Sequence, residues 1–136
     1  MRVVIDTNVL LVSIGKKSPH RWLFDAILSG TLTVLVTNDI LLEYQEIIAQ
    51  QTDAIVAENV IKALTKLPSV EKCTIYYHWK LIEQDPDDDK FADCAVCGDA
   101  DYLITHDKHF NILKTTYFPT VNIISIFDFQ KVISAV

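Results

Sequence analysis

Short apolar segments alternate with amphipathic segments along the chain, and this alternation restricts the possible folds more than any other feature. Residues 3–5 (Val-Val-Ile) are β-branched and entirely apolar, which is typical of a strand buried on both faces. Longer segments with apolar residues at helical spacing separate such runs. Strands that alternate with helices in this way predict an α/β fold with a central, mainly parallel sheet flanked by helices on both faces.

The expected elements are spread over the whole sequence of 136 residues. No internal repeat or linker-like segment interrupts them, so we expect a single domain that spans residues 1–136. The expected strands comprise residues 3–5, 32–36, 73–77, 102–104 and 121–125. The expected helices comprise residues 20–29, 39–50, 52–67, 88–97 and 126–133.

Composition indicates the compartment. No apolar run in the sequence approaches the ~18 residues that a membrane span requires. The apolar run at the N-terminus meets Asp6 at once, which is not the pattern of a secretory signal. The chain has three cysteines, an odd number and too few for a disulfide scaffold. We therefore expect a cytoplasmic protein without a membrane segment.

The net charge of −6 is unevenly distributed. Residues 83–107 contain nine acidic residues and one base, Lys90, so this segment carries −8 and the rest of the chain +2. An acidic total argues against a dedicated binder of duplex DNA, which normally presents a basic face. It does not exclude a nucleic-acid enzyme whose carboxylates hold divalent cations, because a bound cation reverses the local charge.

Four of the acids are expected at the same end of the predicted sheet. Asp6 follows the first strand directly, and Asp107 follows the strand 102–104. Asp88 lies at the start of a helix, and Glu43 lies about one turn into the helix after the second strand. Ligands of parallel α/β sheets bind at the carboxyl ends of the strands, where these side chains would meet. Carboxylates that lie close together repel one another unless a cation is present.

An all-oxygen set of ligands favours Mg²⁺ or Mn²⁺ over Zn²⁺. The chemistry suited to such a site is metal-assisted hydrolysis of a phosphodiester. We expect Asp6, Asp88 and Asp107 to bind the metal, and Glu43 either to bind it or to orient the attacking water.

Other polar residues are expected around this site. The short side chains of Asn8 and Thr105 lie beside two of the acids and are suited to hydrogen-bond to them. Trp22 and Trp79 are isolated aromatics, expected in the core or in a dimer interface, with base stacking as the alternative. Four basic residues in loops or at helix starts are candidate contacts for RNA phosphates, with surface charge as the alternative: Lys16, Lys17, Arg21 and Lys108.

Four segments of the sequence, in order, resemble those of the PIN-domain family, and more narrowly the VapC-like toxins of bacterial toxin–antitoxin pairs. The similarity extends over nearly the whole chain. The segments are Val-Val-Ile-Asp-Thr-Asn (3–8), Leu-Leu-Glu-Tyr (41–44), Asp-Pro-Asp-Asp-Asp-Lys-Phe (85–91) and Ala-Asp-Tyr-Leu-Ile-Thr-His-Asp (100–107).

The resemblance implies a PIN fold and a Mg²⁺- or Mn²⁺-dependent endoribonuclease. It further implies an RNA substrate, a homodimer and an inhibitory antitoxin protein. By position, Asp6, Glu43, Asp88 and Asp107 match the four acids of the family. The sequence departs from the family at His106, where the family usually has glycine.

The run of three aspartates at 87–89 leaves the position of the third acid open. On a helix, Asp88 shares a face with Ala92 and Ala95, small residues that fit against a sheet, whereas Asp89 shares a face with Asp93. We therefore favour Asp88 as the third acid, with Asp89 and Asp93 as second-rank metal ligands.

Cysteines and histidines suggest a different chemistry. Cys94 and Cys97 have the spacing of a redox or metal pair, but no second pair exists, and we expect both to be core residues. We expect His106 and His109 to be exposed loop residues near the path of the phosphates rather than ligands.

Two other functions are consistent with the same residues. One is a PIN-like nuclease of housekeeping RNA or DNA processing. The other is a catalytically silent module that keeps the acidic pocket only to bind a partner protein. Metal-dependent cleavage of single-stranded RNA that is lost with a chelator and in the Asp6→Asn variant would separate a catalyst from a binding module.

Overall fold

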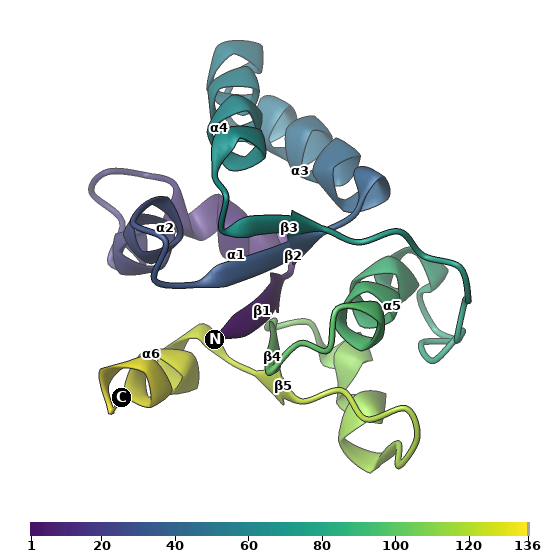
Figure 1. The fold of residues 1–136 in the computed structure, drawn as a ribbon. Helices are drawn as coiled ribbons and strands as arrows, with labels where there is room; N and C mark the ends of the chain where they lie inside the picture. The colour runs from purple at the N-terminus through teal and green to yellow at the C-terminus, as the bar shows by residue number, and fades with distance from the viewer. Residues whose placement is uncertain (136) are drawn as a thin grey trace.

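The computed structural model describes residues 1–135, and a five-stranded sheet lies at their centre (Figure 1). Every neighbouring pair of strands is parallel, and the strand order is β3-β2-β1-β4-β5. The α/β fold with a parallel sheet is thereby confirmed. The strands are β1 (Arg2–Ile5), β2 (Thr33–Val36), β3 (Val70–Lys72), β4 (Tyr102–Ile104) and β5 (Ile123–Ile124).

Helices cover both faces of the sheet. In Figure 1, α5 lies to the right of the sheet and α2 and α6 to its left, whereas α3 and α4 pack together above β3. The α-helices are α1 (Thr7–Ser13), α2 (Arg21–Leu28), α3 (Asn38–Gln51), α4 (Ala54–Lys66), α5 (Asp89–Cys97) and α6 (Ile126–Ser134). Two 3₁₀ segments are η1 (Pro86–Asp88) and η2 (Lys108–Thr115).

Local sequence explains where the helices begin and end. Thr37, Asp53 and Ser125 precede α3, α4 and α6, and each side chain accepts a hydrogen bond from a backbone N–H of the first helical turn. Gly98 ends α5 at a close approach to β2, because a Cβ atom there would lie 2.5 Å from a methyl group of Leu35.

The core forms as the apolar pattern predicts. Val3, Val4 and Ile5 of the central strand β1 are fully buried, which confirms a strand covered on both faces. Tyr44 of α3 is buried as well, and its hydroxyl donates a hydrogen bond to the carbonyl of Ile5. This bond holds α3 against the carboxyl end of β1.

Two expected elements were placed wrongly. The strand expected at 73–77 is instead β3, whose residues 70–72 pair with β2, and residues 73–82 form neither helix nor strand. Aromatic and β-branched residues favoured 73–77, but β3 is a short edge strand that carries charge at Glu71 and Lys72. The strand expected at 121–125 is reduced to the two residues of β5.

The cysteines and tryptophans differ in exposure. Cys94 is buried in the core as expected, but Cys97 is exposed, so that expectation was wrong for Cys97. Both are free thiols. Trp22 stacks on Phe129 of α6, with 6.2 Å between the ring centroids, which is consistent with its expected place in the core. Among the described residues, no helix has the length and apolar character needed to cross a membrane.

The carboxyl ends of β1 and β4 lie side by side. Ile5 pairs with Ile104, and the backbone N–H of Asp6 donates to the carbonyl of Ile104 at 3.0 Å. The residues that follow these strands, Asp6 and Thr105, are therefore neighbours although 99 positions separate them.

Candidate metal centre

Asp6 and Asp107 are joined through one hydroxyl group. The Thr105 side chain donates to Asp6 Oδ2 at 2.8 Å, and the same hydroxyl oxygen accepts the backbone N–H of Asp107 at 3.0 Å. Asp6 is only 6% exposed and Thr105 is equally buried. The hydroxyl of Thr105 therefore fixes the carboxylate of Asp6 in place beside the loop that carries Asp107.

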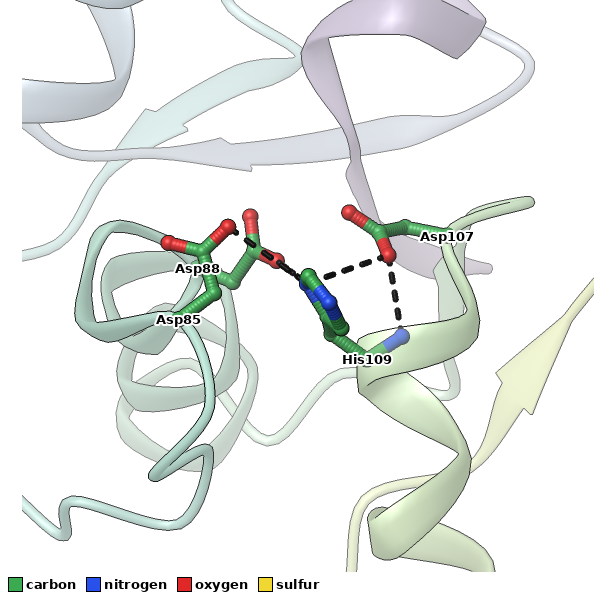
Figure 2. A group of neighbouring side chains, drawn as sticks. All are labelled: Asp85, Asp88, Asp107 and His109. Atoms are coloured by element: carbon green, nitrogen blue, oxygen red, sulfur yellow. Dashed lines mark hydrogen bonds and ion pairs between the residues drawn. The ribbon is translucent and has the colours of Figure 1, made fainter.

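Asp88 and Asp107 approach each other around an imidazole ring (Figure 2). His109 Nδ1 lies 3.5 Å from a carboxylate oxygen of Asp85, 3.6 Å from one of Asp88 and 3.5 Å from one of Asp107. One ligand atom from each of these four residues lies within 4.8 Å of all the others. Three carboxylates and one imidazole nitrogen thus share a volume that fits a single ion.

Two chain segments supply the halves of this cluster. Asp85 caps η1 and accepts the backbone N–H of Asp87 at 3.2 Å. Asp107 caps η2 and accepts the backbone N–H of His109 at 2.9 Å, which orients the imidazole toward the acids. Rings of Phe91 and Phe110 from the elements next to these caps meet edge to face, with 6.3 Å between centroids.

Glu43 enters the region from α3 and both of its carboxylate oxygens have partners. One accepts a hydrogen bond from the hydroxyl of Thr7, and the other lies 2.8 Å from the ammonium group of Lys90. Glu43 and Lys90 are mostly buried, with 26% and 20% of their side chains exposed. Glu43 is therefore held by Thr7 and Lys90 at the edge of the acidic group.

The acids interact electrostatically. Burial raises the pKa of Asp6, and the charges of Asp107 and Glu43 raise it further, whereas the hydrogen bond from Thr105 lowers it. Burial, together with the charges of Asp107, Asp85 and Asp6, raises the pKa of Asp88 to about 7. The charges of these acids therefore act on one another. Of the four predicted acids, Asp88 and Asp107 belong to the group whose ligand atoms lie within 4.8 Å of one another. Asp6 and Glu43 lie outside that group: Asp6 is joined to the loop of Asp107 through Thr105, and Glu43 is held at its edge.

The side chains present fit a divalent cation. Asp88 Oδ2 and His109 Nδ1 are buried atoms, and neither has a hydrogen-bond partner among the described residues. Buried polar atoms without a partner are unfavourable, and a bound cation would satisfy both. Carboxylate oxygens suit Mg²⁺ and Mn²⁺, but the imidazole nitrogen of His109 departs from the all-oxygen set expected from the sequence and suits a transition-metal ion better than Mg²⁺.

The two second-rank acids point to other partners. Asp89 accepts the backbone N–H of Ile82 at 2.8 Å. Asp93 is 3% exposed, and it accepts the backbone N–H of Trp79 at 3.0 Å. Both side chains fasten the segment before η1 onto α5, so the structure brings Asp88 into the acidic cluster and leaves Asp89 and Asp93 outside it.

The remaining predicted residues lie apart from the cluster or beside it. Asn8 is exposed in the first turn of α1, and the neighbouring residue Thr7 makes the contact with Glu43 instead. Arg21 is held by Asp25 at 2.9 Å and by the carbonyl of Ile14 at 2.6 Å, so it has a structural role. The lysines at 16, 17 and 108 are exposed, and Lys108 follows Asp107 directly.

Sequence reasoning missed four residues of this site: Asp85, His109, Thr7 and Lys90. His109 was expected as an exposed loop residue; its side chain is 42% exposed, but the residue lies in η2 and its Nδ1 faces three carboxylates. His106, by contrast, is exposed and packs 5.8 Å from the ring of Phe127. The useful signal for His109 was its position two residues after Asp107, where a capping turn returns the side chain toward the cap.

A cleft of about 830 Å³ adjoins the site on the side of Glu43. It lies between the first half of α3 and the segment from Lys72 to Lys90, and polar side chains line most of it. Glu43 and Lys90 belong both to the wall of the cleft and to the edge of the acidic group. The cleft therefore reaches the edge of the site at Glu43 and Lys90, whereas Asp6, Asp88 and Asp107 do not line it.

Comparison with known proteins places this geometry in a family. Residues 2–109 match the PIN domain family. Among solved structures, a chain of the crystal structure of VapBC2 from Rickettsia felis, bound to a DNA fragment from its promoter, is similar in fold with a TM-score of 0.61. The two are 18% identical, over 92% of this chain and 98% of that one. No curated protein matches the sequence.

Proposed function

This chain belongs to the PIN domain family, and on that premise we propose that it is a Mg²⁺- or Mn²⁺-dependent endoribonuclease. We propose further that the whole chain, residues 1–136, acts as one PIN domain in the cytoplasm. The substrate would be single-stranded or structured RNA, in which the enzyme hydrolyses phosphodiester bonds.

The observation that carries this proposal is the group of acidic ligands within 4.8 Å of one another at Asp85, Asp88 and Asp107, with His109. Thr105 joins Asp6, at the carboxyl end of β1, to the loop that carries Asp107. Such a concentration of negative charge is unfavourable in the metal-free protein, because each ionised carboxylate raises the pKa of the others. A bound cation would offset this repulsion, which explains why the folded protein keeps these carboxylates close together.

We assign roles from the contacts of each side chain. Asp6, Asp88 and Asp107 would hold the cation, because Asp6 is buried and carboxylate oxygens of Asp88 and Asp107 face the same imidazole nitrogen. The hydroxyl of Thr105 would keep the carboxylate of Asp6 oriented. Glu43, held by Thr7 and Lys90, would accept a proton from the attacking water. When bound, a divalent cation supplies Lewis acidity at the phosphate and lowers the pKa of water.

A toxin role in a toxin–antitoxin pair is the biological setting that we propose. It is supported by the fold shared with a chain of VapBC2 and by the match to the PIN domain family. The inhibitor would be a separate antitoxin protein, and the toxin would form a homodimer. Growth arrest on expression, relieved by the product of a neighbouring gene, would test this setting.

Cleavage of a labelled single-stranded RNA by the purified protein tests the catalytic proposal. We expect cleavage with Mn²⁺ or Mg²⁺ that stops with EDTA and is lost in Asp6→Asn and Asp107→Asn. The exposed acid Glu58 on α4 offers a matched control, and Glu58→Gln should cleave as the wild type does. Equal inactivity of wild type and Asp6→Asn at all metal concentrations would contradict the proposal.

A further inference from the structure

An aromatic cluster lies on the surface beside α5. Trp79 is half-buried between Tyr77 and Phe118, whose ring centroids lie 4.7 Å and 5.6 Å from its own. Tyr77 is 64% exposed and Phe118 is 80% exposed, so broad ring surface faces solvent. We call Tyr77, Trp79 and Phe118 the aromatic platform.

The segment of the platform that carries Tyr77 and Trp79 is fastened to α5. Asp93, buried in α5, accepts the backbone N–H of Trp79 at 3.0 Å and lies 3.3 Å from the imidazole of His78. Asp89 accepts the backbone N–H of Ile82 at 2.8 Å. Rings whose backbone is held in this way lose little conformational entropy when a ligand binds them.

The platform is built from the same two chain segments as the candidate metal centre. The segment with Tyr77 and Trp79 runs into η1, which ends at Asp88, and the segment with Phe118 follows η2, which Asp107 caps. In Figure 1 the loops after β3 and after η2 both lie on the α5 side of the sheet. Asp93, which holds the backbone of Trp79, lies five positions after Asp88, a rise of roughly 7–8 Å at helical spacing, so α5 carries contacts to both the platform and the acids.

Local charge distinguishes the platform from the rest of this acidic chain. Residues 74–80 and 114–120 contain five of the thirteen Phe, Tyr and Trp residues of the sequence. The same segments contain two lysines and one histidine, and no Asp or Glu. The carboxylate of Asp93 that contacts this segment is buried, so the exposed rings have lysines of their own segments beside them. Such a surface suits a ligand that offers flat apolar faces and phosphates.

We propose that the aromatic platform binds the unpaired bases of single-stranded RNA next to the phosphate that is cleaved. The proposal rests on the proposed function, because it names the class of RNA that this site accepts. Bases of an unpaired strand are free to stack on protein rings, whereas those of a duplex are already stacked and paired. Lys80 and Lys114, in the same segments, would contact the phosphates of the bound strand.

Fluorescence anisotropy of a labelled single-stranded oligoribonucleotide tests the platform, with Ca²⁺ as the only divalent cation and intact RNA verified on a gel. Trp79→Ala and Phe118→Ala should each weaken binding roughly 5- to 100-fold, which is the range of one stacked base. Trp79→Phe keeps a ring and should bind nearly as wild type. Ile55→Ala, which removes an exposed apolar side chain on α4, should have no effect.

Comparing binding of the oligoribonucleotide with binding of an abasic oligomer of equal length shows whether the bases stack on the platform. Wild type should prefer the base-bearing strand, and Phe118→Ala should lose most of that preference. Phe118 is so exposed that its substitution should leave the fold intact, which circular dichroism verifies. Loss of binding by the Ala variants to both strands alike would overturn stacking.

Other outcomes separate this proposal from the proposed function. RNA cleavage by the wild type, with unchanged RNA binding by both Ala variants, would overturn the platform and leave the nuclease intact. In the opposite case, the Ala variants lose base-dependent binding but the wild type shows no Mn²⁺-dependent cleavage. That result would support the platform and contradict the nuclease. If the variants lose only dimerisation or antitoxin binding, the platform is a protein interface and the proposal is wrong.

Discussion

Lys90 of α5 and Glu43 of α3 form an ion pair, with 2.8 Å between the ammonium nitrogen and Glu43 Oε1. The same ammonium group donates to the carbonyl of Asp87 at 2.6 Å. Both side chains are mostly buried, so solvent screens this pair less than a surface pair. One of the four predicted acids is thus already balanced by a cation of the chain itself.

Lys90→Met should tighten Mn²⁺ binding several-fold, because it removes a positive charge next to the acids. It should also lower the free energy of unfolding of the metal-free protein, since Glu43 would be left without its partner. Titration calorimetry and urea denaturation measure the two effects. Lys62→Met breaks an exposed pair with Glu58 on α4 and is the control, expected within about 0.5 kcal/mol of wild type. Unchanged Mn²⁺ affinity in Lys90→Met would show that the charge of Lys90 does not act on the bound cation.

Thr105→Val should weaken Mn²⁺ binding by about tenfold, the lower end of the effect of removing a partner that orients a ligand. The hydroxyl of Thr105 bridges Asp6 and the N–H of Asp107, and valine has nearly the same shape without it. Thr105→Ser restores a hydroxyl and should restore the affinity. If Thr105→Ser binds Mn²⁺ as weakly as Thr105→Val, packing of the methyl group is the cause, and the bridge is unimportant.

Substitutions within the aspartate run test which acid belongs to the metal centre. Asp88→Asn should abolish Mn²⁺ binding and stabilise the metal-free protein at pH 8, because it removes a repelled carboxylate. Asp93→Ala should keep Mn²⁺ binding and lower the free energy of unfolding by about 1–3 kcal/mol, since the Trp79 N–H loses its acceptor. Urea denaturation and calorimetry of both variants separate the roles. The reverse pattern would assign the metal to Asp93.

The sequence was sufficient to predict the sheet and the acids because both follow from short-range patterns. The apolar run before Asp6 predicts a buried strand, and strand ends predict where carboxylates meet. Helical spacing favoured Asp88 over Asp89, and in the structure Asp88 lies in the cluster whereas Asp89 holds the backbone of Ile82. Asp88 itself ends η1, one residue before α5 begins, so the helical spacing that favoured it applies to it only by extension of the helix.

The residues that could not be predicted depend on contacts between distant segments. Lys90 contacts Glu43 only because α5 packs against α3, and no pattern in the sequence of either helix predicts this ion pair. Trp79 has Tyr77 near it in the sequence, but it also contacts Phe118 from a segment almost forty residues later, which no local pattern predicts. The strand expected at 73–77 failed for a similar reason. Only the N–H of Cys73 still donates to β2, at the carbonyl of Val36, and the chain then leaves the sheet for α5, where Asp93 accepts the N–H of Trp79.

Stability of the metal-free protein should fall as the pH rises from about 4 to about 7. The pKa of Asp88 is about 7 in the folded protein, against about 3.9 in an unfolded chain, and burial raises the pKa of Asp6 in the same direction. Between these values the folded state binds more protons than the unfolded state, so each rise in pH favours unfolding. The stabilisation that the folded state gains by binding this proton is complete below pH 4 and lost above pH 7. It amounts to about a few kcal/mol.

Mn²⁺ should reverse this loss, because the cation binds the ionised carboxylates and competes with protons. We expect Mn²⁺ to raise the melting temperature more at pH 8 than at pH 5, and Asp88→Asn to flatten the pH dependence of the metal-free protein. Urea denaturation from pH 4 to pH 8 in EDTA measures the second effect, and thermal melts with and without Mn²⁺ measure the first. Asp99→Asn, at an exposed acid outside the cluster, should keep the slope of the wild type. A metal-free protein that gains stability toward pH 8 would show that these carboxylates are stabilised by partners within the chain, and the need for a cation would disappear.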